Sequence, residues 1–257
     1  MKIYNKIKSI VNRNQEDHTI EIQDDTLLKA QAAGSIQENS QIKRTDVINY
    51  LIQEFNFNSY LEIGVRNPDD NFSLIEIEKK YSVDPGVEFE SNPVDFKMTS
   101  DDFFEKVAKG ELLDSNVKFD LIFVDGLHLA NQVKKDILNS VNYISENGFI
   151  LLHDCNPPTE WHAREDYSYK NGPAGYYWNG TTWKAFVQAR NSANLNACCI
   201  DADWGIGILS KQKFIDEPSV VENPFFEYKT FDQNRENSLN LITFDEFKKQ
   251  ISTLRSS

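Results

Sequence analysis

Apolar residues recur along the chain in two spacings, and their alternation predicts a doubly wound α/β fold. Continuous apolar runs occur at 60–64, 119–125 and 148–154, which is typical of strands buried on both faces of a parallel sheet. Between the second and third runs, the apolar positions follow the spacing of one helix face: Leu129, Val133, Ile137, Val141 and Ile144. Strand, helix and strand in series indicate a mostly parallel sheet with helices on both faces.

Weaker patterns on either side of this unit extend the prediction to a domain of residues 41–257. We expect one helix at 101–110, with Ser100 as its cap and Gly110 at its end. The remaining predicted elements are a helix at 43–55, a short helical stretch at 72–77, strands at 81–84, 94–98, 197–200 and 205–209, and helices at 181–191 and 244–254.

Two segments follow neither spacing. Residues 1–40 are polar, so we expect a loosely packed N-terminal arm with room for a short helix. Residues 155–180 are rich in Pro, Gly and aromatic residues, which predicts a lid whose rings stack on a sugar or an aromatic acceptor. Within this lid, we expect Arg164 to form an ion pair with Glu160 or Asp166.

Composition narrows the class of partner. The chain has 257 residues and a net charge of −13, whereas binding to nucleic acid or to an anionic membrane needs a basic face. A neutral or cationic small molecule fits this charge better. No apolar run approaches the roughly 20 residues of a membrane span, and three cysteines do not make a disulfide framework. We therefore expect a cytoplasmic protein that binds neither nucleic acid nor membrane; a homo-oligomer is compatible with the sequence.

Acidic residues stand at the ends of the predicted strands, where ligands bind in doubly wound folds. Gly64 lets the backbone approach a ligand closely, and Asp84 follows at about the 20-residue spacing at which an acid reaches ribose hydroxyls. No G-x-G-x-x-G sequence follows the first strand, and Asp69 and Asp70 would repel a pyrophosphate. A nucleoside without phosphates, such as S-adenosylmethionine (SAM), is the better fit.

Four segments resemble, in order, the motifs of class I SAM-dependent methyltransferases. They are Leu-Glu-Ile-Gly-Val at 61–65, Ser-Val-Asp-Pro at 82–85, the run from Phe119 to His128, and the run from Gly148 to Asp154. They are most similar to the bacterial branch of sugar and secondary-metabolite O-methyltransferases, which includes macrocin-type enzymes. The resemblance covers about residues 43 to 210 and implies a Rossmann-like, seven-stranded sheet.

The resemblance also implies a role for each matching position in cofactor binding. Glu62 and Gly64 would line the methionine and ribose side of SAM, and Asp84 would hold the ribose hydroxyls. Asp125 would lie beside the methyl group. The residues expected to border the adenine are Thr99, Ser100 or Asp101.

A second set of polar residues, which includes Asp125 and Asp154, lies at the ends of the predicted strands at 119–125 and 148–154. Carboxylate oxygens suit Mg²⁺ or another divalent cation. Similar metal-dependent O-methyltransferases use two acids and an amide, so the resemblance implies Asp125, Asp154 and Asn156 as ligands, with Asn156 displaced by one position. Such a metal would hold a substrate hydroxyl and lower its pKa. Alternatively, His128 or His153 is the general base.

The leading interpretation is a SAM-dependent O-methyltransferase that acts on a small hydroxylated acceptor, such as a saccharide or a secondary metabolite. Because the loop after Gly64 lacks further glycines, a non-catalytic module that binds a nucleoside or a glycan precursor stays open as the alternative. A nicotinamide-dependent oxidoreductase is a third interpretation, and the missing G-x-G-x-x-G sequence counts against it.

Overall fold

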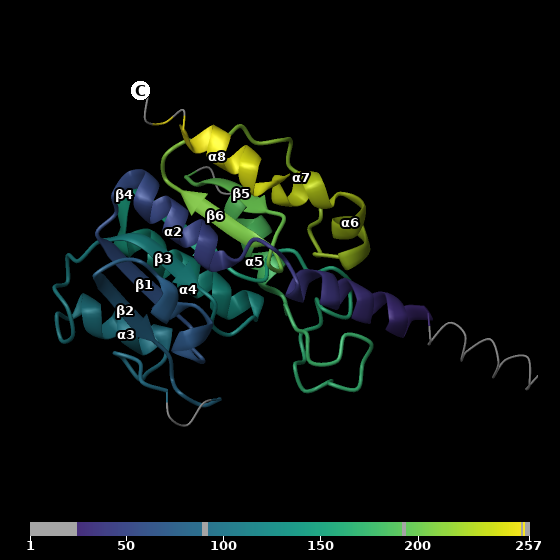
Figure 1. Ribbon diagram of the computed structural model, residues 1–257, viewed down its shortest axis with the longest axis horizontal. Coiled ribbons are helices and arrows are strands. Elements are labelled where there is room, and N and C mark those ends of the chain that lie inside the picture. Colours follow the sequence, from purple (N-terminus) through teal and green to yellow (C-terminus); the bar gives the residue numbers. More distant parts are fainter. Residues whose placement is uncertain (1–24, 89–91, 192–193, 253, 255–257) are drawn as a thin grey trace, which may run out of the picture.

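A seven-stranded sheet forms the centre of the computed structural model, which describes residues 25–88, 92–191, 194–252 and 254 (Figure 1). The strands lie in the order β2-β1-β3-β4-β6-β5-β7. Of these, β6 is antiparallel to its neighbours β4 and β5, and the other described strands run in one direction. The predicted doubly wound, mostly parallel sheet is confirmed. Its strands are β1 (Ser59–Ile63), β2 (Lys79–Val83), β3 (Phe119–Val124), β4 (Ile144–Leu152), β5 (Asn196–Ile200), β6 (Ile206–Ser210) and β7 (Leu241–Ile242).

Helices cover both faces of the sheet because successive strand side chains point to opposite sides. In β3, Ile122 and Val124 pack in one apolar core, whereas Leu121 and Phe123 pack in the other. The first core includes α3 (Ser100–Ala108), α4 (Ala130–Tyr143), α5 (Thr182–Arg190), α6 (Tyr228–Gln233) and α7 (Arg235–Leu239). The second core includes α2 (Arg44–Phe55) and α8 (Phe244–Ser252), and Figure 1 shows α2 lying across β1 and β3.

The predicted strand at 94–98 is wrong, and its place is taken by a single bridge between Phe96 and Val83. Pro93, just before it, has no N–H to give to a ladder. The Asp95 carboxylate accepts the Ser82 main-chain N–H at 2.9 Å, so a side chain occupies a donor that a full strand would use.

Several element boundaries also differ from the prediction. The cap of α3 is Thr99, whose hydroxyl accepts the Asp102 N–H, and Ser100 is already helical. Strand β4 begins at Ile144, where the predicted helix was still continuing. The stretch predicted as helical at 72–77 contains the short 3₁₀ turn η2 (Phe72–Leu74), which follows a second such turn, η1 (Pro68–Asp70). The elements α6, α7 and β7 were not anticipated.

The two irregular segments meet in space. Residues 25–38 form a helix, and the part of the predicted arm before residue 25 lies outside the described residues. Residues 155–180 contain neither helix nor strand, as expected for a long loop. Gln37 accepts the Trp204 main-chain N–H at 2.9 Å, and Glu38 accepts a hydrogen bond from the Tyr177 hydroxyl. None of the described helices combines the length and the apolar composition that a membrane span requires.

Candidate functional site

The carboxyl ends of β1, β3 and β4 lie side by side and place the first residue after each strand on one rim. Ladder-like hydrogen bonds continue beyond the strands: the Asp125 N–H donates to Ile63 at 2.8 Å, and the His153 N–H donates to Val124 at 3.1 Å. This alignment brings Gly64, Asp125 and His153 together.

Gly64 is required at this rim by the contact between two strand ends. Its φ is +89°, and a Cβ atom there would lie 2.3 Å from the Asp125 carbonyl oxygen. A Cβ would also lie 2.4 Å from the Cα atom of Gly126. The close approach is therefore to another part of the chain, whereas the sequence had suggested an approach to a ligand.

Asp125, His128 and Asp154 form a cluster in which one ligand atom from each residue lies within 4.8 Å of the other two. His128 Nε2 is 3.3 Å from Asp125 Oδ1, and His128 Nδ1 is 3.3 Å from Asp154 Oδ2. The backbone of Asp154 has a φ of +61°, a conformation that few residues other than glycine adopt. Asn179 donates to its second carboxylate oxygen, Oδ1, at 2.8 Å.

His128 is held as a cation by its partners. Its Nδ1 lies 3.0 Å from the Trp178 carbonyl oxygen, and its Nε2 faces the Asp125 carboxylate, so both nitrogens donate. Burial lowers the pKa of His128, but the charges of Asp154 and Asp125 outweigh burial and raise it to about 9. The Trp178 ring stacks on the imidazole at a centroid distance of 5.2 Å.

His153 is more deeply buried, with 5% of its side chain exposed. Its Nδ1 lies 3.1 Å from Asp154 Oδ2 and 3.4 Å from Asp125 Oδ1. Burial and Arg44 both lower the pKa of His153, but Asp154 and Asp125 raise it well above its ordinary value. Burial raises the pKa of Asp125, yet His153 and Arg44 hold it well below its usual range.

Arg44 and Asp203 join this cluster, and sequence reasoning missed both. Arg44, the first residue of α2, places Nη1 2.8 Å from His153 Nε2 and 3.5 Å from Asp125 Oδ2. Asp203 lies in the turn between β5 and β6, where it has a φ of +45°, and it accepts the Arg44 main-chain N–H at 2.9 Å. The sequence marked this segment only as a turn, and Arg44 carried no signal.

Asn156, one of the three residues predicted as metal ligands, has a side chain that is hydrogen-bonded to other residues. Its amide nitrogen donates to Asp201 at 3.0 Å, and its oxygen accepts from Arg235. His128 instead stands beside the two acids.

Two of the residues predicted to bind the cofactor, Glu62 and Asp84, lie at the ends of β1 and β2. Glu62 is buried and accepts hydrogen bonds from Tyr60 at 2.6 Å and Asn71 at 2.9 Å, and burial raises its pKa to about 7. Asp84 is half-buried, which raises its pKa, and it accepts the Gly86 N–H at 2.6 Å. The Asn92 amide donates to the Val65 carbonyl, and its Oδ1 is buried without a hydrogen-bond partner.

Thr99, Ser100 and Asp101 are engaged elsewhere within the described chain. Thr99 caps α3, and Ser100 donates to the buried Asp136 of α4 at 2.6 Å. Asp101 pairs with Lys135 at 2.8 Å. In the described part of the chain, no hydrogen bond or ion pair joins these three to Asp84 or Asp125, so their predicted place beside the adenine stays a prediction.

The loop at 155–180 is fastened by Arg164 in a way that differs from the expected ion pair. Its guanidinium donates to the carbonyl oxygens of Trp161, Gly175 and Tyr177, each at 2.8 Å. Carbonyls rather than acids therefore hold this side chain.

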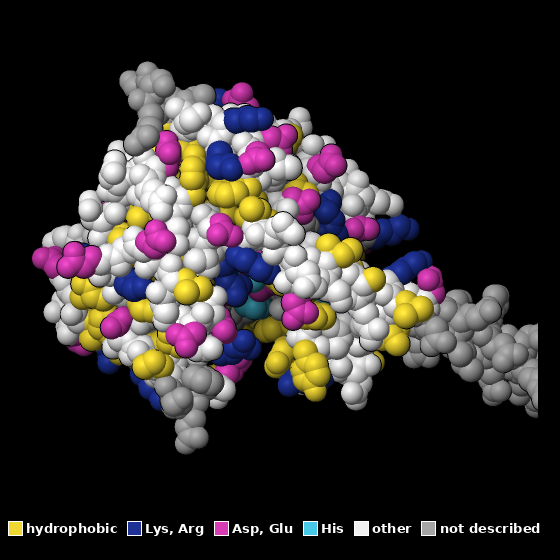
Figure 2. Space-filling model, in the orientation of Figure 1, with side chains coloured by type: hydrophobic (Ala, Val, Ile, Leu, Met, Phe, Trp, Pro, Cys, Tyr) yellow, Lys and Arg dark blue, Asp and Glu magenta, His cyan; other side chains and the backbone are white. Residues whose placement is uncertain are grey.

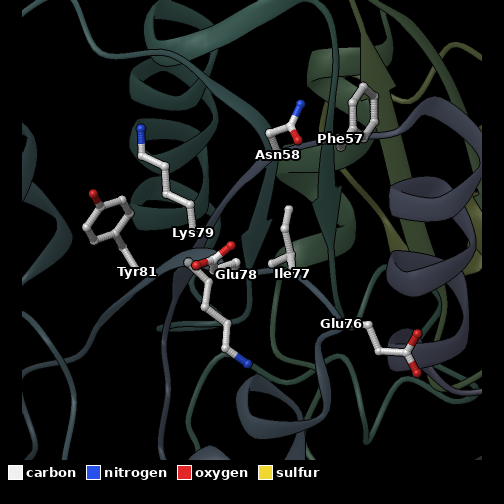
Figure 3. A pocket seen from close by; sticks show the side chains of 8 residues that line it. Phe57, Asn58, Glu76, Ile77, Glu78, Lys79 and Tyr81 are labelled. Carbon is white, nitrogen blue, oxygen red and sulfur yellow. The ribbon is translucent and has the colours of Figure 1, made fainter.

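One face of the molecule is hollowed near its centre. Figure 2 shows histidine atoms at the bottom of a central hollow, with Lys, Arg, Asp and Glu side chains at its rim. A separate pocket of about 680 Å³ lies at the opposite edge of the sheet, lined by Phe57 and Asn58 before β1 and by residues 76–81 at the start of β2 (Figure 3). That pocket contains none of the predicted site residues.

A comparison with known protein families finds a match that includes the ends of β1, β3 and β4. The model of a family described as a methyltransferase domain matches residues 61–155, from β1 to just beyond β4. The matched segment therefore carries the sequence pattern of a methyltransferase domain, and it includes Glu62, Gly64, Asp84, Asp125, His128, His153 and Asp154. No curated protein sequence matches the chain.

Solved structures resemble the chain at low sequence identity. An O-methyltransferase from Bacillus cereus in complex with SAH is 13% identical over 72% of this chain and 89% of that chain, with a TM-score of 0.41. The cofactor-bound Rv0187 from MTB is 15% identical over 73% and 90%, with a TM-score of 0.45. An SAH-bound methyltransferase from Podospora anserina is 16% identical over 79% and 97%, with a TM-score of 0.41.

Proposed function

We propose that the chain is a SAM-dependent O-methyltransferase that acts on a small hydroxylated acceptor. The observation that carries this proposal is the convergence of Asp125, His128 and Asp154 at the carboxyl ends of β3 and β4. Glu62 and Asp84 lie at the neighbouring strand ends, and the methyltransferase-domain match over residues 61–155 supports the cofactor class.

The residues at the ends of β1 and β2 fit a nucleoside cofactor. The Asp84 carboxylate is half-buried and offers oxygens to the two hydroxyls of a ribose. The buried Oδ1 of Asn92 has no hydrogen-bond partner, which a donor on a bound molecule would satisfy. Bound SAM would supply a methyl group that its sulfonium has already activated.

The residues at the ends of β3 and β4 fit a divalent cation. Asp125, His128 and Asp154 would hold it through two carboxylates and one imidazole, a set that suits Mg²⁺, Mn²⁺ or a similar metal. The charge of such an ion lowers the pKa of a bound hydroxyl. We leave Asn156 out of this set, because its side chain is bonded to Asp201 and Arg235.

Residues of the chain can accept the proton that the acceptor hydroxyl releases. The hydroxyl gains a methyl group and releases one proton, so a base must stand at the rim. Without the cation, His128 is an imidazolium and can accept this proton only after losing its own, whereas Asp125 is already ionised. The Trp178 ring covers one side of His128, which restricts water at the reacting oxygen.

The acceptor that we propose is a saccharide or a secondary metabolite with a flat face. Exposed rings of the loop at 155–180, among them Tyr169 and Tyr176, offer surfaces for stacking. Trp161 stacks on Tyr169 at 6.2 Å and extends this aromatic surface.

The test begins with calorimetric titration of SAM and SAH, followed by transfer of a labelled methyl group to a panel of hydroxylated acceptors. We expect binding of both nucleosides and transfer to at least one acceptor. Asp125→Asn should retain SAH binding and lose transfer by at least about 100-fold. Absence of SAM and SAH binding would refute the proposal, and binding without transfer to any acceptor would favour the non-catalytic module.

A further inference from the structure

We propose that Arg44 recognises a carboxylate on the acceptor, so that the site selects an anionic hydroxylated molecule. This inference rests on the proposed function, because it concerns the acceptor of that same site. It also reverses the expectation of a neutral or cationic ligand, which followed from the net charge of −13.

The Arg44 guanidinium is anchored through one end only. Nη1 lies 2.8 Å from His153 Nε2, 3.5 Å from Asp125 and 3.9 Å from Asp203. Within the residues that the structure describes, no acceptor meets Nε or Nη2, and neither atom is among the buried polar atoms without a partner. Among the described residues, this edge of the guanidinium therefore has no partner.

The unused edge has the shape that a carboxylate needs. Nε–H and Nη2–H point the same way from the planar guanidinium and form two parallel hydrogen bonds with a carboxylate. The Arg44 side chain is 22% exposed, whereas His153 beneath it is 5% exposed, so Arg44 lies between the buried cluster and the solvent. Lys and Arg side chains stand at the rim of the central hollow (Figure 2).

The position of Arg44 is fixed before any ligand arrives. Asp203 accepts the Arg44 main-chain N–H at 2.9 Å and also lies 3.6 Å from Lys43 Nζ. Lys43 adds a second positive charge next to Arg44 and is 42% exposed. A preorganised arginine beside a partly exposed lysine binds an anion without a large cost in side-chain entropy.

Three other described arginines, Arg164, Arg190 and Arg235, differ from Arg44 in their contacts. The guanidinium of Arg164 donates to three carbonyl oxygens, and that of Arg190 also donates to three. Arg235 is bonded to Asn156 and Asp232, among others. These side chains fasten loops, whereas Arg44 keeps one edge of its guanidinium for a ligand.

Two small molecules with the same hydroxyl groups, of which only one is charged, measure the contribution of the carboxylate to binding. 3,4-Dihydroxybenzoate and 3,4-dihydroxybenzamide differ in one carboxylate, and both are titrated into the full-length protein with SAH and Mg²⁺ present. We expect the benzoate to bind at least about tenfold more tightly than the amide. In Arg44→Gln this ratio should fall to about one.

Two further variants keep the result interpretable. Arg44→Lys retains the charge without the planar edge and should keep only part of the preference for the benzoate. Lys109→Gln removes a remote exposed charge at the end of α3 and should leave the ratio as it is. Retention of SAH binding by each variant shows that the fold and the cofactor site are intact.

Two outcomes would overturn the inference: equal affinity of the unaltered protein for both probes, or a preference for the benzoate that survives in Arg44→Gln. If the unaltered protein did not bind SAH, the proposed function itself would be refuted. Failure of this inference and failure of the proposed function therefore give different results.

Discussion

The carboxylate of Asp203 accepts the main-chain N–H of Arg44 at 2.9 Å, although 159 residues separate them in the sequence. The same carboxylate lies 3.4 Å from His153 Nε2. The turn between β5 and β6 therefore caps the start of α2 and contacts the residue that follows β4. Three segments that are distant in the sequence meet at one side chain.

Replacement of Asp203 by Asn should lower the free energy of unfolding by about 2 kcal/mol at pH 7. Asn tolerates the positive φ, so the variant mainly removes the charge. Burial raises the pKa of Asp203, but His153 and Arg44 outweigh it and lower the pKa to about 2. The stabilisation is full above the unfolded pKa of about 3.9 and is lost as the pH falls through 2. Urea unfolding should show about half of the difference remaining at pH 3; a difference independent of pH would contradict this explanation.

Substitution of three glycines by alanine distinguishes the cost of steric overlap from the cost of a strained backbone. Gly64→Ala should cost more than about 3 kcal/mol or prevent folding, because its Cβ would overlap the Asp125 backbone at a φ of +89°. Gly110→Ala has the positive φ but nothing within 4 Å, so we expect a cost of about 1 kcal/mol. Gly126→Ala, with its nearest neighbour at 3.8 Å, should be close to neutral. Thermal unfolding measures the series, and equal losses at Gly64 and Gly110 would exclude the overlap as the cause.

Replacement of Asp136 by Asn should raise the free energy of unfolding by about 2 kcal/mol at pH 7. Burial between α3 and α4 raises the pKa of Asp136 to about 6. The folded protein therefore holds this proton between about pH 4 and 6, and stability falls as the pH rises through that window. An Asn oxygen still accepts from Ser100 and Gln132. Most of the gain should disappear at pH 4 in urea titrations, and a gain of equal size at both pH values would refute the assignment.

Metal binding should depend on His128 and not on Asn156. In Mn²⁺ titrations followed by electron paramagnetic resonance, His128→Gln and Asp154→Asn should each weaken binding at least about tenfold. Asn156→Ala should stay within about twofold of the unaltered protein. Since the pKa of His128 is about 9, the cation must displace a proton, and affinity should rise between pH 6 and 9. If Asn156→Ala lost as much Mn²⁺ affinity as His128→Gln, Asn156 would be a ligand, as expected from the sequence.

Replacement of Arg164 by Met should loosen the loop at 155–180 while the sheet stays protected. The guanidinium satisfies three carbonyl oxygens, which would lose their partner together. We expect faster amide exchange across the loop, measured by mass spectrometry. Asp166→Asn is the matched control and should have no such effect, because Arg164 bonds to carbonyls. If Asp166→Asn loosened the loop as much, the ion pair expected from the sequence would be right.

Much of the sheet could be predicted because its signals are local. A buried parallel strand is a continuous apolar run, and from Leu121 to Val124 the residues of β3 alternate between the two cores. The positions of Asp125 and Asp154 follow from the same logic, since neighbouring parallel strands end at one edge. The strand at 94–98 was predicted wrongly, because the Asp95 side chain takes a hydrogen bond that the pattern assigns to the backbone, and β7 was not anticipated.

The sequence by itself determined the layered α/β fold and the rim on which acidic residues gather, because strand periodicity and parallel pairing depend on neighbouring positions. Only the tertiary structure decided which side chains complete the rim. The φ of +61° at Asp154 redirects the chain, and Asn156 bonds to Arg235 and not to the cluster. Arg44 reaches Asp125 because α2 packs across the sheet, which is a long-range contact that no local spacing encodes.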